Sequence, residues 1–344
     1  MEATPSVWTH VDTKTHVACL IAYAGVFRDV VRVSALKEDM PGVEPARIER
    51  ALAELAASGR VVVRDGWAAL PCLEDRIGGK ESALRLAEEL IDAKMPILKR
   101  LGRIPIVEFV GISGSLAAGN PVRDENGRID LDVFMIARSQ CLWLLFIPMA
   151  LLWTVAGTDP GNGLCFNLVM DGSDLSVYNR NLFTASEIRK LRPVSGLRAY
   201  GAFLRRNSWV DRYFGGTAGG TDRPVRPGSR DAVNKMFYVV YGLCRCLKNL
   251  SLEPLTGLSF RKDPYGPKTH SRIGASYGGH QAVVYRSFVD ICREWFPDLI
   301  DEKLVERLFP DDMSVILRTK SGGFDEIMAK TGLRPECFQK YRQA

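Results

Sequence analysis

The chain has 344 residues, 46% of them hydrophobic and 25% charged, and a formal net charge of +6 from 46 basic and 40 acidic side chains. This composition is typical of a soluble globular protein and excludes collagen-like, coiled-coil and largely disordered chains. The modest basic excess permits a polyanionic partner and does not require one. The length predicts two or three domains, at roughly 100–200 residues per domain.

Eight cysteines are scattered along the chain, and none belongs to a Cys-x-x-Cys pair. With no pattern of a secretion signal beside them, we expect reduced thiols in a cytoplasmic protein. The apolar stretch 141–156 contains Pro148 and is shorter than the roughly 20 residues that a membrane-spanning helix needs. The sequence therefore predicts a buried helix there, and no stable membrane insertion.

Residues 14–71 have the pattern of a winged helix, within a first domain that we predict over residues 1–75. This helix-turn-helix variant combines three helices with a two-stranded hairpin and is known from DNA-binding domains. Asp65-Gly66 supplies the two-residue turn of the hairpin. The predicted helices cover 17–27, 34–37 and a segment that begins at Pro45 and stops at Gly59, and the predicted strands cover 60–64 and 67–70.

Basic side chains give this first domain a means of contacting nucleic acid. The candidate contacts are Arg47, Arg50, Arg60 and Arg64. Glutamates interrupt the same face, so a winged helix used for packing or dimerisation is an equally weighted alternative. Formation of a homodimer through this domain is therefore an open alternative.

Helices and strands mix in the second predicted domain, residues 76–213, and a helical third domain covers residues 214–344. A segment rich in Gly, Pro and Arg, 214–230, marks the boundary between them. Thr184 and Glu187 have the spacing of a capping box that opens a helix. The other elements predicted in the second domain are a helix at 80–101 and strands at 106–112, 129–137, 164–170 and 175–178.

The most informative pattern is Gly114-Ser115 followed by Asp130-Leu131-Asp132. Side chains alternate across a strand, so the two aspartates lie next to each other on one face. Neighbouring carboxylates repel, and a divalent cation such as Mg²⁺, which prefers oxygen ligands, removes that cost. Gly114 allows a phosphate to approach the backbone closely, and Ser115 adds a hydroxyl donor beside the amides of the helix that opens there. This combination indicates metal-assisted phosphoryl transfer.

These residues resemble the signature of the DNA polymerase β-like nucleotidyltransferase superfamily, in which a Gly-Ser pair precedes an Asp-hydrophobic-Asp strand. The resemblance implies an α+β fold: a nucleotidyltransferase-like mixed sheet with flanking helices, here preceded by a winged helix and followed by a helical domain. It also implies two Mg²⁺ ions held by Asp130 and Asp132, and an NTP whose terminal phosphates contact Ser115 and the amide of Gly114. An acceptor hydroxyl would attack the α-phosphate, and pyrophosphate would leave.

The chain departs from this family in its third carboxylate, which such enzymes carry on a later strand. Asp174 is our choice as third catalytic and metal-binding acid, with Asp171 as the second candidate. Either could instead be a turn residue. Asn167 could occupy the third position, and its amide could not act as a base. Lys248, in the helical part, is the basic residue that we assign to the triphosphate.

Two functions follow as hypotheses. The first is a Mg²⁺-dependent nucleotidyltransferase that moves an NMP to a hydroxyl of RNA, protein or a small molecule, with the acceptor left open. The second is a winged-helix nucleic-acid-binding regulator whose nucleotidyltransferase-like domain only senses nucleotide. A third acid within metal reach of Asp130 and Asp132 favours the enzyme, and its absence favours the sensor.

Overall fold

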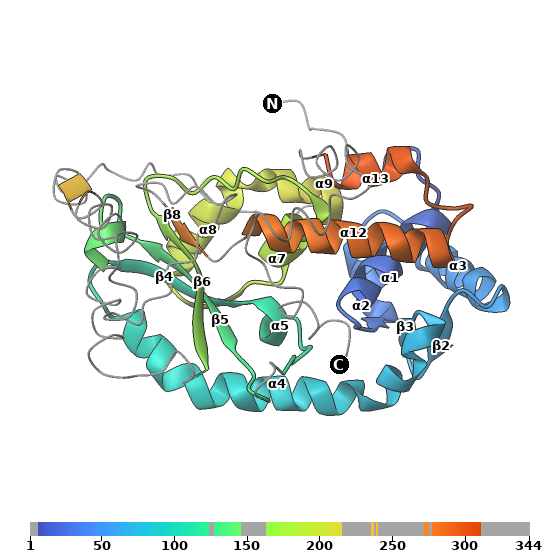
Figure 1. Cartoon of the computed structure of the whole chain (residues 1–344), viewed down its shortest axis with the longest axis horizontal. Coiled ribbons are helices and arrows are strands. Elements are labelled where there is room, and N and C mark those ends of the chain that lie inside the picture. Colours follow the sequence, from blue (N-terminus) through green and yellow to red (C-terminus); the bar gives the residue numbers. More distant parts are fainter. Residues whose placement is uncertain are drawn as a thin grey trace, which may run out of the picture.

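The protein is a mixed α+β structure with a mixed sheet, which confirms the predicted fold class at this level (Figure 1). The computed structural model describes residues 6–123, 127–145, 163–214, 235–236, 239, 272–274 and 277–310. Within these residues, three strands form a small antiparallel sheet and five form a larger one.

The N-terminal module, residues 6–73, has the element order that the sequence predicts for a winged helix. A short strand, β1, joins the hairpin and gives the sheet order β1-β3-β2. Asp65 and Gly66 both have positive φ, 53° and 78°, as the predicted two-residue turn requires. The elements are α1 (Thr13–Val26), β1 (Val31–Arg32), α2 (Val33–Asp39), α3 (Pro45–Ala57), β2 (Val62–Arg64), β3 (Trp67–Ala69) and the 3-10 turn η1 (Pro71–Leu73).

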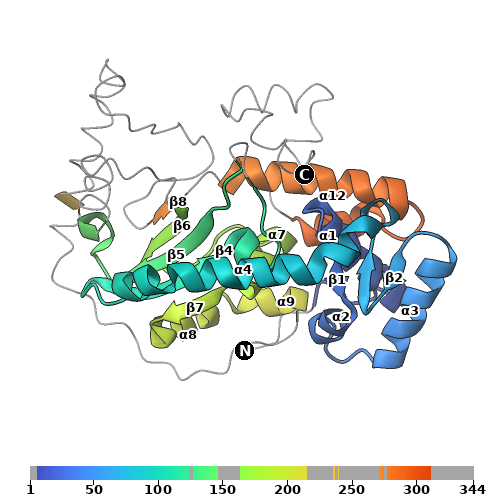
Figure 2. The same ribbon diagram turned by 90° about the horizontal axis from the view of Figure 1, so that it is seen from below.

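Helix α4 (Glu74–Leu101) connects the module to the larger sheet and packs against both (Figure 2). It begins six residues before the predicted start, because Gly78 and Gly79 lie inside the helix rather than in a connector. Glycine lowers helix propensity by only about 1 kcal/mol, and burial of Ile77 and Lys80 on either side outweighs that cost.

The larger sheet has the strand order β7-β4-β5-β6-β8. Strands β5 and β6 are parallel, whereas the other neighbours are antiparallel. Strand β5 is central and buried on both faces, with Leu131, Val133 and Met135 in one apolar cluster and Phe134 and Ile136 in another. The bounds are β4 (Val107–Ser113), β5 (Leu131–Ala137), β6 (Leu164–Asp171), β7 (Arg192–Ser195) and β8 (Arg272–Gly274).

The strand predicted at 175–178 is wrong, because this segment has no strand partner. Its backbone is held instead by the side chain of Asn207, which accepts from the N–H of Val177 at 2.8 Å and donates to the carbonyl of Leu175 at 2.8 Å. A side-chain amide thus supplies the donor and acceptor that a neighbouring strand would otherwise provide.

Four short elements follow in the chain: α7 (Leu182–Arg189), α8 (Leu197–Arg206), η3 (Ser208–Val210) and α9 (Asp211–Phe214). The predicted capping box at the start of α7 is wrong. The N-cap is Asn181, whose side chain accepts from the N–H of Thr184 at 2.9 Å. Thr184 therefore lies inside the helix, and Glu187 is free of a capping role.

The described part of the third predicted domain packs onto the other two. Helix α12 (Tyr277–Trp295) lies against α1, and β8 pairs with β6 at the edge of the larger sheet (Figure 1). Gln281 on α12 accepts hydrogen bonds from Asn179 at 3.1 Å and Asn181 at 3.3 Å. A short helix, α13 (Glu302–Leu308), completes this part.

Within the residues that the structure describes, no helix is long and apolar enough to span a membrane. Of the apolar segment predicted as a buried helix, residues 142–145 are helical and Trp143 is fully buried. Residues 146–156 lie outside the described residues.

Candidate active site

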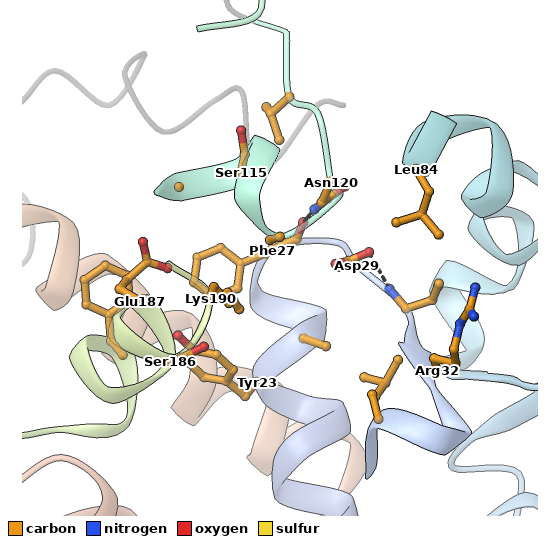
Figure 3. Close-up of a pocket in the computed structure, with 18 of the residues that line it drawn as sticks. Tyr23, Phe27, Asp29, Arg32, Leu84, Ser115, Asn120, Ser186, Glu187 and Lys190 are labelled. Atoms are coloured by element: carbon orange, nitrogen blue, oxygen red, sulfur yellow. Dashed lines mark hydrogen bonds between the residues drawn. The ribbon is translucent and has the colours of Figure 1, made fainter. Parts of the chain in front are cut away.

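A cavity of about 640 Å³ lies between the N-terminal module and the larger sheet. This volume is in the range of cavities that bind small molecules and cofactors. Its lining combines both halves of the predicted signature with residues of α1, α2, α4 and α7. Figure 3 shows Ser115 on the same cavity as Tyr23 of α1, Leu84 of α4 and Glu187 of α7. Among the lining residues are Gly114, Ser115, Asp130, Asp132, Asn167, Glu187 and Lys190.

The Gly-Ser turn lies against Asp132, the second acid of the pair. Strand β4 ends at Ser113, which lies opposite Asp132 in the antiparallel register, and the one-turn helix α5 (Gly114–Ala117) follows. Gly114 has a φ of +69°, and a Cβ atom there would collide with the carboxylate of Asp132. A glycine is therefore required both by its backbone conformation and by the acid beside it.

The two aspartates differ in exposure. Asp130 lies just before the first residue of β5 and is exposed, whereas Asp132 lies within the strand and is partly buried. Both line the cavity, as the alternation along the predicted strand requires. An acid pair of this kind can present carboxylate oxygens from one edge of the cavity.

The structure does not bring Asp171 or Asp174 to this cavity. In the parallel register Asp132 lies opposite Cys165, whereas Asp171 lies opposite Ala137. Five residues of strand separate these positions, or roughly 16 Å. The buried carboxylate of Asp171 instead accepts from three backbone N–H groups at the start of the helix that follows β5. These are the N–H groups of Gln140, Cys141 and Leu142.

Asp174 lies beyond the end of β6, in the segment that Asn207 holds. Its carboxylate accepts from the N–H of Ser176 at 3.3 Å and from the hydroxyl of Tyr178 at 3.2 Å. These contacts are those of a turn residue, which was the alternative to a catalytic role.

Two residues of β6 line the cavity: Cys165, which lies opposite Asp132, and Asn167. The register of β5 and β6 shifts between Val133 and Phe134, so Asn167 is the extra residue of a bulge and lines the cavity. Within the described residues, no group of three His, Cys, Asp or Glu side chains is arranged to hold a metal ion. Two carboxylates still suit Mg²⁺ when substrate phosphates and water complete its octahedral shell.

Glu187 is a site residue that sequence reasoning missed, because its spacing from Thr184 resembled a capping box. It lines the cavity together with Gly114 and Lys190. Burial raises the pKa of Glu187, while the charge of Lys190 and the nearby backbone N–H of Gly114 oppose the rise. The amide that the sequence assigned to a phosphate therefore lies near a carboxylate of α7.

Lys80 is the second missed residue. It is 6% exposed, and its Nζ lies 2.5 Å from a carboxylate oxygen of Asp29 and donates to the carbonyl of Gly119 at 3.0 Å. The side chain of Asn120 also donates to the carbonyl of Phe27 at 3.0 Å (Figure 3). The end of the Gly114–Asn120 turn is thus bonded to α4 and to the module.

Helix α7 contacts the same module. Arg189 lies 3.5 Å from Asp39 of α2, whose pKa is raised by burial against the effect of this arginine. The Nζ of Lys190 lies 5.3 Å from the ring centroid of Phe27 and 5.6 Å from that of Tyr23, both on or next to α1. At these distances the ammonium group of Lys190 makes cation–π interactions with both rings, and these interactions hold α7 against the module.

The other predicted binding residues differ in their surroundings. Lys248 lies outside the described residues. Of the four arginines proposed for nucleic acid, Arg60 pairs with Asp298 at 2.5 Å and Arg64 with Glu74 at 2.9 Å. The remaining two, on α3, are exposed.

The geometry defines a mixed-sheet α+β protein whose cavity joins a Gly-Ser turn to paired aspartates. Comparison of the chain with protein-family models, curated proteins and solved structures found no significant match.

Gly114→Ala should destabilise the protein more than Gly59→Ala. Both glycines have left-handed backbones, φ +69° and +71°, and each alanine should cost about 1–2 kcal/mol for that conformation. Only at Gly114 does the new Cβ meet another group, the Asp132 carboxylate, and overpacking of this kind adds about 1–3 kcal/mol. Urea unfolding of both variants gives the comparison, and equal losses would contradict the contact.

Proposed function

We propose that the protein is a Mg²⁺-dependent nucleotidyltransferase that moves an NMP from an NTP to an acceptor hydroxyl. The single observation that carries this proposal is the contact between the turn at Gly114 and the carboxylate of Asp132, inside one cavity that also includes Ser115 and Asp130. A phosphate-binding turn and an acid pair need this proximity in order to act on one triphosphate.

The proposed roles follow from the chemistry of each side chain. Asp130 and Asp132 would hold Mg²⁺, with phosphate oxygens of the substrate and the amide oxygen of Asn167 available as further ligands. The bound metal supplies charge neutralisation on the phosphates. The hydroxyl of Ser115 would donate to a phosphate oxygen. The acceptor hydroxyl would attack the α-phosphorus and release its proton to solvent as the bond to the β-phosphate breaks, and pyrophosphate would leave.

The order β4, Gly-Ser turn and acid-bearing β5 supports a resemblance to the DNA polymerase β-like nucleotidyltransferase superfamily. An amide at position 167 departs from that pattern, and we do not include Asp174 in the proposed site. The exposed arginines of α3 leave nucleic acid as a proposed partner of the module.

Asp130→Asn and Asp132→Asn should each lower NTP-dependent pyrophosphate release by about 10³-fold or more, because metal stabilisation of the transition state is worth several kcal/mol. The assay would incubate the full chain and Mg²⁺ with each α-labelled NTP and with RNA, protein or metabolite fractions. The labelled fraction identifies the acceptor. Asp65→Asn, on the exposed turn of the wing, is a control of equal charge change. Release that both site variants retain would defeat the proposal.

A second candidate function, a nucleotide sensor without transfer activity, is favoured by Asn167. An amide cannot accept the proton of an acceptor hydroxyl as a carboxylate can. In that case the chain would bind Mg²⁺–NTP, with binding lost in Asp132→Asn, while no fraction became labelled. If Asp174→Asn loses transfer activity, Asp174 is the third catalytic acid that the sequence suggests.

A further inference from the structure

Two charged side chains lie beside the turn that carries Ser115, one at each end. At its end, Lys80 donates to the carbonyl of Gly119. At its start, Gly114 lies in the same cavity wall as Glu187 of α7, near enough for its N–H to oppose the rise in the pKa of that carboxyl. Ser115 lies between these two contacts, and the Asp132 carboxylate lies against Gly114.

Both contacts lead to the N-terminal module. Lys80 is paired with Asp29, in the loop between α1 and β1, and this ion pair is largely buried. Glu187 belongs to α7, which the module contacts through the Asp39–Arg189 pair and through the rings of Tyr23 and Phe27 beside Lys190 (Figure 3). A module that served only to bind nucleic acid would not need to contact this turn through both α4 and α7.

We infer that the N-terminal module positions the Ser115 turn against the acid pair, and that Glu187 and Lys80 are the positioning residues through which it acts. The effect of this positioning on catalysis rests on the proposed function, whereas the positioning of the turn itself does not. The module is then a part of the active site, and a partner that displaced it would alter the geometry of the turn.

The structural content can be tested by hydrogen exchange of the backbone amides in 114–120, measured by mass spectrometry on the full chain. Lys80→Met removes the hydrogen bond to Gly119, and Glu187→Met removes the carboxylate beside Gly114. We expect the amides of this turn to exchange about tenfold faster or more in each variant. Glu187→Gln keeps an oxygen that can accept from Gly114, and it should retain most of the protection.

Leu308→Ala is the matched control for a general loss of stability. Leu308 is buried on α13, outside the module, and does not line the cavity. Its truncation should destabilise the protein and leave exchange of the turn within about twofold of wild type. Equal acceleration in Leu308→Ala would overturn the inference, as would unchanged exchange in both methionine variants.

The catalytic meaning is tested by kcat and KM for pyrophosphate release at a temperature where every variant is folded. We expect kcat to fall about tenfold in Glu187→Met and Lys80→Met, to recover in Glu187→Gln, and to be unchanged in Leu308→Ala. If exchange changes as expected while wild type releases no pyrophosphate, the proposed function fails and the positioning by the module stands. If kcat per folded molecule is unaffected, the positioning role is overturned.

Discussion

Lys80→Met is expected to lower the free energy of unfolding by about 3–5 kcal/mol, the usual cost of leaving one partner of a buried ion pair without the other. The Lys80 side chain is 6% exposed and its partner Asp29 19% exposed. Methionine fills a similar volume but leaves a carboxylate and the carbonyl of Gly119 without their donor. Denaturant unfolding of the purified variant measures the loss.

An exposed ion pair provides the control. Lys37 and Glu49 lie 2.7 Å apart with side chains 35% and 60% exposed. Exposed pairs contribute about 0–1 kcal/mol, so Lys37→Met should have little effect. In the double variant Asp29→Leu/Lys80→Met no charge is left unpaired, and part of the lost stability should return. Similar small losses in Lys80→Met and Lys37→Met would show that Lys80 is hydrated in solution.

Acidification below pH 6.5 should destabilise the protein through His16. This histidine is 6% exposed and stacks on Trp8 with ring centroids 3.6 Å apart, and burial lowers its pKa to about 3. In the unfolded chain the pKa is near 6.5, so between these values the unfolded state binds a proton that the folded state excludes. Stability is therefore present above pH 6.5 and falls by about 1.4 kcal/mol per pH unit toward pH 3.

His16→Phe isolates this effect, because phenylalanine keeps a ring on Trp8 and cannot be protonated. We expect the free energy of unfolding of the variant to depend less steeply on pH between 6.5 and 4, where the difference from wild type should reach several kcal/mol. The Nε2 atom of His16 has no hydrogen-bond partner among the described residues, so its removal should cost little. Parallel stability curves for the two proteins would refute the burial of a neutral histidine.

Much of the N-terminal module and part of the site could be predicted because short stretches of sequence determine them. Pro45 begins α3, and the Asp65-Gly66 turn sets the wing. The proximity of Gly114 and Asp132 could also be predicted, because the turn and the strand that carry them are close in the sequence.

The features that the sequence did not predict depend on contacts between distant elements. Glu187 reaches Gly114, and Lys80 reaches Asp29, across more than 50 residues of sequence. The sequence favours Asp174 because it adjoins the predicted strand at 175–178. That strand does not form, and the parallel pairing of β5 with β6 directs this end of β6 away from the acid pair. Strand direction and side-chain partners of this kind arise from tertiary packing, which hydrophobic periodicity does not report.

The length of α4 has a consequence for how this chain can be divided. Its 28 residues extend for roughly 40 Å and begin at Glu74, so the boundary that composition suggests after residue 75 falls in the first turn of the helix. A fragment cut there would separate Ile77 from the apolar cluster that it shares with Leu36 and Phe109. Residues 1–75 and 76–344, expressed separately, should therefore be less soluble than the full chain, because each half exposes apolar surface that this cluster buries.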